Sequence, residues 1–200
     1  MPAPHAGAGT DFQLVLVCTA NQIRSPIAEA LVQRLAGALP LATRSLGILD
    51  LGSRPSPRDA VEAAEDFGLD ISRHRSRWLE PGSLRECDAV VGFEPVHVAT
   101  AVLEGGAPTE RVFLLRELVD LLEQEDPPAE HEPVERARLA VARAHERRRA
   151  LRSPRIGASL DDPLGRGRNA YRSAVRELGE LVPRLVDGLF PPKSSGGRDR

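Results

Sequence analysis

Residues 14–26 of this chain run LVLVCTANQIRSP. The near-continuous apolar stretch at residues 12–17 is typical of a strand buried on both faces of a parallel sheet. The stretch ends in Cys18, and Arg24 follows six positions later. A helix is expected over residues 26–39, because apolar side chains recur there at helical spacing. The sequence therefore predicts a thiol and a guanidinium where a buried strand passes into a helix.

This junction suits chemistry on a phosphate ester. A helix start favours negative charge through its free N–H groups and its dipole, and so favours a thiolate at Cys18. The intervening loop can turn its N–H groups inward as an anion-binding nest. Arg24 offers a planar fork that matches two phosphate oxygens. Cys18 is the candidate nucleophile, which would attack phosphorus in line and form a cysteinyl-phosphate.

The rest of the chain alternates short apolar strands with helices. Strands are expected at residues 41–46, 88–93 and 111–115, and helices at residues 56–67, 95–103 and 171–189. This alternation predicts an α/β fold, a single three-layer domain in which a parallel sheet carries helices on both faces. Ligands of such sheets bind at the carboxyl ends of the strands, where Cys18 is expected to lie.

Composition narrows the classes of function. The balance of 27 Lys and Arg against 29 Asp and Glu, a net charge of −2, predicts no nucleic acid or membrane partner. No apolar run approaches the roughly 20 residues that span a bilayer, and the start of the chain lacks the pattern of a secretory signal, so a cytoplasmic location is expected. Cys18 and Cys87 make no disulfide framework. The five histidines have no ligand spacing, so neither a metal nor a cofactor is expected.

At these residues the chain resembles the low-molecular-weight protein tyrosine phosphatases. That family opens with a strand, then Cys-x5-Arg-Ser-Pro and a helix, and its middle section is similar to residues 59–93 here. The resemblance implies a four-stranded parallel sheet in the flavodoxin-like order 2-1-3-4. It also implies a phosphate-binding loop made of Thr19, Ala20, Asn21, Gln22, Ile23, Arg24 and Ser25.

Two residues of this loop carry more specific expectations. By resemblance, Asn21 hydrogen-bonds within the loop and keeps the loop carbonyls turned away from the anion. Ser25 has two interpretations: it donates its hydroxyl to the Cys18 thiolate, as the family implies, or it caps the following helix with Pro26 at the first helical position. The two roles are compatible.

A carboxylic acid must protonate the departing oxygen. The family carries an Asp-Pro pair in a loop before its last helix, and residues 159–165 of this chain run SLDDPLG. The resemblance therefore implies that Asp162 is the general acid, and then the general base for the attacking water. Asp161 is the alternative. Pro163 holds the preceding residue extended.

The chain also departs from the family. Ala20 stands where the family usually has Gly, Ile23 where it often has a second Cys, and Leu164-Gly165 where phosphotyrosine-selective members carry aromatic residues. The leading hypothesis is a metal-independent phosphatase of phosphomonoesters, acting on protein tyrosine, whose substrate is a phosphorylated protein or a small phosphomonoester. One alternative is arsenate reductase, for which Cys87 is the only other thiol. Another is a non-catalytic phosphate- or phosphoprotein-binding module.

The predicted domain spans residues 12–190, between disordered tails at 1–11 and 191–200. Residues 124–159 look like a charged helical insertion relative to the family pattern. Its arginines either recruit an acidic partner or belong to a solvated helix held by Glu/Arg pairs. Cys87 is expected in the core, and His74 in a solvated turn.

Overall fold

A computed structural model describes residues 11–124, 126–130, 132–151 and 159–192 of the chain. Its sheet contains four parallel strands, β1 (Phe12–Cys18), β2 (Leu41–Gly47), β3 (Ala89–Gly92) and β4 (Val112–Leu114). Their order is β2-β1-β3-β4, so β1 lies inside the sheet with a partner on each edge. The expected α/β class and the 2-1-3-4 order are confirmed.

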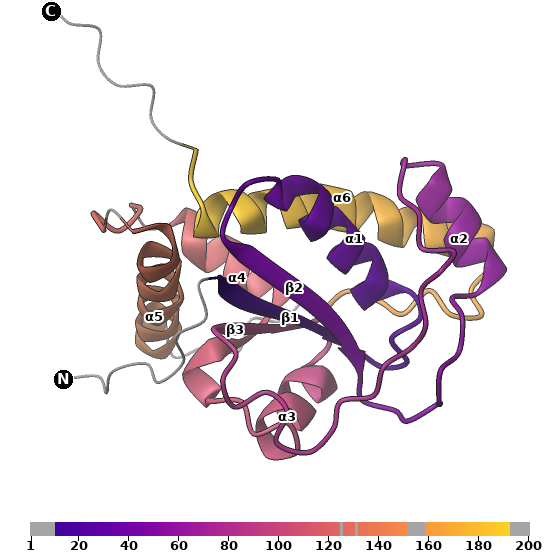
Figure 1. The fold of residues 1–200 in the computed structure, drawn as a ribbon, viewed down its shortest axis with the longest axis horizontal. Coiled ribbons are helices and arrows are strands. Elements are labelled where there is room, and N and C mark those ends of the chain that lie inside the picture. The colour runs from indigo at the N-terminus through magenta and orange to yellow at the C-terminus, as the bar shows by residue number, and fades with distance from the viewer. Residues whose placement is uncertain (1–10, 125, 131, 152–158, 193–200) are drawn as a thin grey trace, which may run out of the picture.

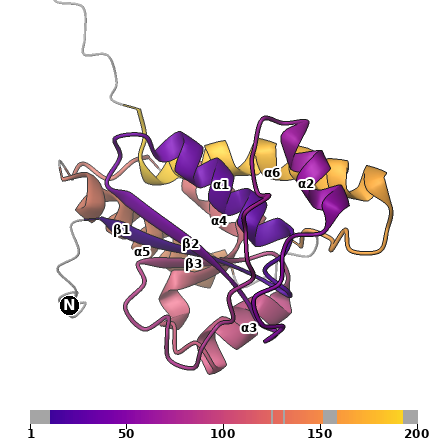
Figure 2. The ribbon, with the colours of Figure 1, turned by 45° about the vertical axis from the view of Figure 1, so that its right-hand side comes forward.

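Six α-helices and one 3-10 turn connect and cover these strands in the described part of the chain. They are α1 (Arg24–Ala36), α2 (Arg58–Glu65), α3 (Pro95–Leu103), η1 (Thr109–Arg111), α4 (Leu115–Glu123), α5 (Pro133–Leu151) and α6 (Arg168–Leu189). Figures 1 and 2 show α1, α2 and α6 on one side of the sheet and α3 on the other. The sequence did not predict α4, which begins directly after β4 without a break.

The two faces of β1 enter two separate hydrophobic cores. Leu14 and Leu16 pack into the larger core with α1, α4 and α6. Val15 and Val17 pack into the smaller core with α3 and the start of β3. This two-sided burial explains the continuous apolar run before Cys18. It also fixes Cys18 at the carboxyl end of an inner strand.

Helix α1 begins earlier than the sequence suggested. Its first residue is Arg24 and its N-cap is Ile23, which makes no side-chain cap hydrogen bond. The interpretation of Ser25 as the N-cap, with Pro26 at the first helical position, is therefore wrong. The Ser25 hydroxyl is directed at the Cys18 thiol instead. Pro26 is tolerated because the first-turn N–H groups have no partner within the helix.

Helix α5 occupies much of the predicted charged insertion. Arg138 pairs with Asp88 at 2.8 Å, just before β3. The Arg148 guanidinium lies 4.2 Å from the centre of the Phe113 ring and donates to the Val112 carbonyl. These contacts hold α5 at the end of the sheet where β1 begins, away from Cys18 (Figure 1). The helix also contains the expected Glu/Arg pairs, Arg138 with Glu135 and Arg149 with Glu146. It is not simply solvated, because one of its faces is buried, at Ala137, Ala140, Val141 and Ala144.

Parts of the predicted tails and insertion, at residues 1–10, 125, 131, 152–158 and 193–200, lie outside the described residues. Within the described ranges, none of the helices has the length and apolar character needed to cross a membrane.

Candidate active site

The loop after β1 wraps its backbone around the Cys18 thiol. The sulfur lies 2.9 Å from the Ser25 hydroxyl oxygen and 3.2 Å from the Asn21 backbone nitrogen, whose N–H it accepts. Asn21 has a φ of 51° and is the one non-glycine residue with positive φ in the described ranges. Asparagine tolerates this conformation, and Ala20 does not need it. Alanine in place of the family's usual glycine therefore adds no left-handed strain to this loop.

The Asn21 side chain ties the loop to β2 and to the segment after α2. Its amide nitrogen donates to the hydroxyls of Ser25 at 2.9 Å and Ser45 at 2.8 Å. Its amide oxygen accepts the Arg77 backbone N–H at 2.8 Å. Its backbone carbonyl lies 2.7 Å from Nε2 of His74, so this carbonyl points away from the thiol.

Three further residues support this network, and no sequence motif marks them. Gly47 is needed because a Cβ there would lie 2.9 Å from backbone atoms of both Ala20 and Asn21. Ser45 donates to the buried Glu29 at 2.5 Å, and Glu29 also accepts from Arg77 at 2.6 Å. The one available signal was a glutamate within the apolar stretch of α1.

The expectation that His74 lies in a solvated turn is wrong. The ring is partly buried against the Asn21 carbonyl, and burial lowers its pKa.

Arg24 is held by four groups from three parts of the chain. Its side chain is buried, with Nη1 donating to Glu94 at 2.6 Å and to the Leu160 carbonyl at 2.8 Å. Nη2 donates to the Thr19 hydroxyl at 3.1 Å and to Asp162 at 2.6 Å. Two carboxylates therefore share one guanidinium beside the Cys18 thiol.

The loop before α6 brings Asp162, and not Asp161, to this point. Asp162 contacts Arg24 through one oxygen and accepts the Leu164 N–H at 3.1 Å through the other, a local turn that sets its direction. Asp161 points into solvent, 82% exposed, and pairs with Arg166. Cys18, Arg24 and Asp162 line one small hollow together with Ala20, Gln22, Ile23 and Leu164.

His97 supports the loop from the start of α3. Its Nδ1 accepts the backbone N–H groups of Phe93 at 3.2 Å and Glu94 at 3.0 Å, so the proton of the neutral ring is on Nε2. That proton is donated to the Thr19 hydroxyl oxygen at 3.0 Å. Burial and then the charge of Arg24 lower the pKa of His97 to about 4.

The Thr19 oxygen thus accepts from His97 and from Arg24, and its own proton remains for another acceptor. No motif in the sequence marks Glu94 or His97 as part of the site. The signal was their position directly after β3, beside the carboxyl end of β1.

The described residues contain no group of three or more histidine, cysteine, aspartate or glutamate side chains that could hold a metal ion. Cys87 is buried, as expected, and burial raises the pKa of its thiol. It lies just before β3, whose first residue, Ala89, pairs with Leu14 in β1. Cys87 is therefore near the amino end of the sheet, at the opposite end of β1 from Cys18.

A sequence profile and similar curated proteins both point to one protein family. The sequence profile described as low molecular weight phosphotyrosine protein phosphatase matches residues 13–147. The chain is 28% identical over 115 residues to the low molecular weight protein-tyrosine-phosphatase Etp of Escherichia coli. The matched region covers 57% of this chain and 76% of Etp. It is 30% identical over 110 residues to the protein-arginine-phosphatase of Bacillus subtilis, covering 54% and 73%.

The fold is similar to the crystal structure of the low molecular weight protein tyrosine phosphatase from T. tengcongensis. The TM-score is 0.65 at 22% identity, and the match covers 88% of this chain and 99% of that one.

Proposed function

Because the chain belongs to the low molecular weight phosphotyrosine protein phosphatase family, we propose that it hydrolyses phosphomonoesters on protein side chains through a cysteinyl-phosphate on Cys18. One observation carries this proposal. Asp162, which is 138 positions from Arg24 in the sequence, lines the same hollow as Cys18 and Arg24. Cys18, Arg24 and Asp162 are the nucleophile, the phosphate ligand and the proton donor that the reaction needs.

The nucleophile is supported by donors that favour a thiolate. The Ser25 hydroxyl and the Asn21 N–H both reach the Cys18 sulfur. A hydrogen bond to a charged group is worth about 1.5–3 kcal/mol, so these two donors favour the reactive form. The N–H groups of residues 19–25 and the free proton of the Thr19 hydroxyl would bind the phosphoryl oxygens.

Substrate binding requires an exchange at Arg24. Asp162 now accepts a hydrogen bond from Nη2, which is one prong of the fork expected to bind phosphate. A phosphate dianion would take this place and release the Asp162 side chain next to the ester oxygen. Asp162, once protonated, would give its proton to that oxygen as the P–O bond breaks. It would then take a proton from the water that hydrolyses the cysteinyl-phosphate.

Phosphotyrosine and phosphoarginine are both candidates for the phosphorylated side chain. The family profile is described by phosphotyrosine, and one similar protein is named a protein-arginine-phosphatase. The wall of the hollow, among the described residues, contains Gln22 and Leu164 but no aromatic ring. This wall lacks the stacking surface that would favour a tyrosine ring. Phosphoarginine is therefore the second candidate substrate.

Arsenate reduction is less well supported. That reaction needs further thiols to pass electrons outward from Cys18. Cys87, the only other cysteine, is buried near the opposite end of β1.

Hydrolysis of p-nitrophenyl phosphate in the presence of EDTA tests the proposal. We expect turnover by the unaltered protein, none by Cys18→Ser, and a loss of about 10²–10⁴-fold in Asp162→Ala. The Asp162→Ala loss should be larger with phenyl phosphate, whose leaving group is poorer. Cys87→Ser is the matched control and should retain full activity. Turnover by the unaltered protein no faster than that of Cys18→Ser would refute the enzyme assignment and favour a non-catalytic phosphate-binding module. Phosphotyrosine and phosphoarginine peptides of one sequence then separate the two substrates.

A further inference from the structure

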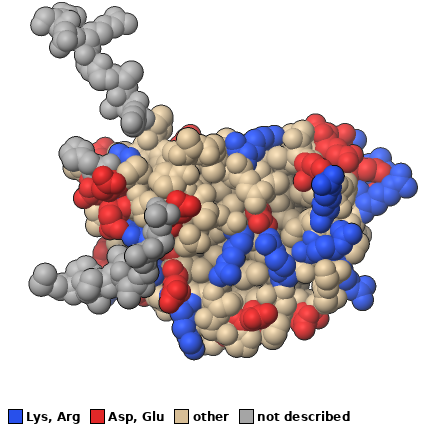
Figure 3. Space-filling view, viewed as in Figure 1, with Lys and Arg blue, Asp and Glu red and all other residues tan. Residues whose placement is uncertain are grey.

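Two surface segments beside the hollow are rich in arginine and free of acidic residues. Residues 51–58 and 71–79 together contain five arginines and no Asp or Glu. These are Arg54, Arg58, Arg73, Arg75 and Arg77, all of them exposed. Figure 3 shows the basic side chains of this face gathered on its right-hand half, over the segment that follows α2. The chain thus has a locally basic surface although its net charge is −2.

Three of these arginines make no ion pair with a described carboxylate. Two surface arginines of α6 pair with carboxylates, Arg172 with Asp66 and Arg184 with Glu123. By contrast, Arg54, Arg73 and Arg75 make no ion pair within 4.0 Å to any described carboxylate. We call these three residues the basic stripe. Hydrogen bonds from Ser72 and the charge of Arg73 lower the pKa of Asp70. Arg54 and Arg75 donate to the backbone carbonyls of Leu51 and His74 rather than to a carboxylate.

The basic stripe is fastened directly to the catalytic loop. Gln22 lines the hollow, and its side-chain amide donates to the Pro55 carbonyl at 2.8 Å. Pro55, next to Arg54, forms an isolated antiparallel bridge with Arg75. His74, between Arg73 and Arg75, contacts the Asn21 carbonyl. The peptide chain of a substrate whose phosphate is bound beside Cys18 would therefore reach the stripe where it extends past Gln22.

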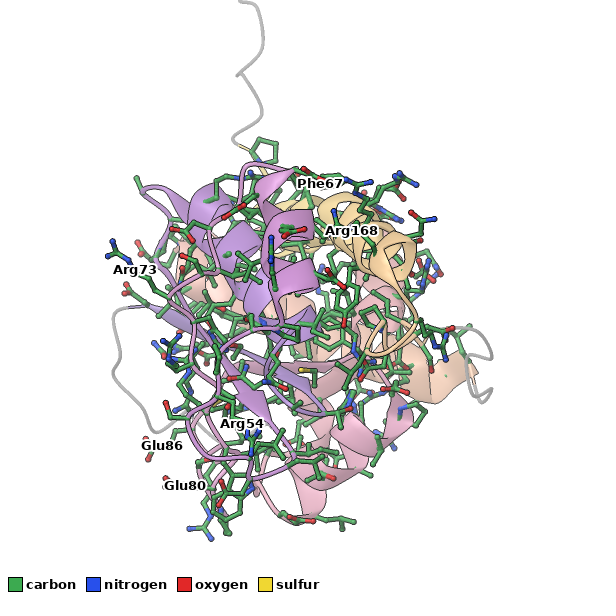
Figure 4. All side chains as sticks on the ribbon, turned by 90° about the vertical axis from the view of Figure 1, so that its right-hand side faces the viewer. Arg54, Phe67, Arg73, Glu80, Glu86 and Arg168 are labelled. Atoms are coloured by element: carbon green, nitrogen blue, oxygen red, sulfur yellow. The ribbon has the colours of Figure 1, made fainter. Side chains whose placement is uncertain are left out.

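The surface beside the stripe is concave. A hollow of about 380 Å³ lies between the first turns of α1 and the segment that carries Arg73 and Arg75. Glu29 lines this second hollow, and its carboxylate already accepts hydrogen bonds from Arg77 and Ser45. Asp70 also lines it and is held by the N–H and hydroxyl of Ser72. Figure 4 shows the labelled Arg73 at the upper left edge of the molecule and the labelled Arg54 lower down, near Glu86 and Glu80.

We propose that the basic stripe binds an acidic segment next to the phosphorylated side chain of a protein substrate. This inference rests on the proposed phosphatase function. The two segments that carry the stripe are bridged to each other, and one of them is bonded to Gln22, which lines the hollow of Cys18. A peptide whose Asp or Glu residues lie a few positions from the phosphorylated residue would therefore bring them to the stripe. Each exposed charge pair is expected to change kcat/KM by about two- to fivefold, and the field of the stripe adds to the rate of encounter.

The test compares three phosphotyrosine peptides whose flanking residues are acidic, neutral or basic. With the unaltered protein, kcat/KM should be about tenfold higher for the acidic peptide than for the neutral one, and this preference should shrink at high salt. The double variant Arg54→Gln, Arg75→Gln should lose the preference and still hydrolyse p-nitrophenyl phosphate at the normal rate. Arg176→Gln, an exposed arginine on α6, is the matched control and should retain the preference.

The outcomes separate this inference from the proposed function. Loss of p-nitrophenyl phosphate hydrolysis in the unaltered protein would remove the phosphatase assignment itself. Normal hydrolysis with no preference for the acidic peptide, or with a preference that the double variant keeps, would overturn the docking role alone. Tighter binding of a single-stranded oligonucleotide than of the acidic peptide would also overturn it and assign the stripe to nucleic acid.

Discussion

Acidification is expected to destabilise this protein through His97. The neutral ring accepts the N–H groups of Phe93 and Glu94 at one nitrogen, so a proton placed there would replace attraction by repulsion. Burial and the charge of Arg24 lower the pKa of His97 from 6.5 to about 4. Between these values the unfolded chain binds a proton and the folded chain does not. The free energy of unfolding therefore falls as the pH drops below 6.5, and this group has no effect above that range.

The size of the effect follows from the two pKa values. The loss reaches about 3 kcal/mol once the pH lies below both values, and it is already about 2 kcal/mol at about pH 5. Domains of this kind are stable by about 5–15 kcal/mol, so the loss is a large part of the total. Protonation of His97 would also affect the site, because the neutral ring bonds the Thr19 hydroxyl and the Glu94 N–H.

Urea unfolding followed by the fluorescence of Trp78, the only tryptophan, measures this effect. The matched variant is His97→Gln, which puts a capping residue that does not titrate at the same position of the first turn of α3. Carboxylates titrate in both proteins, so the difference between them isolates His97. We expect the advantage of the unaltered protein to shrink by about 2 kcal/mol from neutral pH to about pH 5. If the difference in free energy of unfolding between the two proteins stays constant over this range, the folded protein does not hold His97 neutral with a lowered pKa.

Three substitutions test the geometry of the loop. Gly47→Ala should lower kcat on p-nitrophenyl phosphate by about tenfold or more, since its methyl group would lie 2.9 Å from the loop backbone; an unchanged kcat would mean that the close packing of Gly47 is unimportant. Ser25→Ala should slow alkylation of Cys18 by iodoacetamide by about tenfold at neutral pH, because the thiolate loses a donor; equal rates would remove the Ser25 hydroxyl from this role. Asp162→Asn should bind inorganic phosphate about tenfold more tightly in calorimetric titration while kcat falls, because Arg24 loses a competing carboxylate; weaker binding would contradict that competition.

The sequence predicted the part of the fold that local signals control. The run before Cys18 is apolar on both faces because β1 is buried on both faces, and the helix expected at residues 171–189 carried one apolar stripe, which is the buried face of α6. Helix α4 was missed because β4 passes into it with no turn residue between them. The start of α1 was misplaced because Ser25, a frequent N-cap residue, uses its hydroxyl for Cys18 instead.

The candidate site was predictable only where a motif marked it. The spacing of Cys18 and Arg24 and the Asp-Pro pair at Asp162 carried a family signature. The supporting residues carried none, since their roles depend on contacts between distant segments. Gly47 matters because the loop after β1 crosses the end of β2, and His97 because the carboxyl ends of β1 and β3 lie side by side.

The two carboxylates on Arg24 have different structural settings, which predicts an order of events. Glu94 is the N-cap of α3, its backbone fixed by His97, and it holds Nη1 together with the Leu160 carbonyl. Asp162 lies on a loop followed by glycines with positive φ, and it holds only Nη2. An incoming phosphate dianion would therefore displace Asp162 and leave Glu94 in place. The guanidinium would keep its plane, because Nη1 stays bonded while Nη2 exchanges partners. The displaced carboxyl would start within reach of the phosphate oxygens, so phosphate binding and placement of the general acid become a single step.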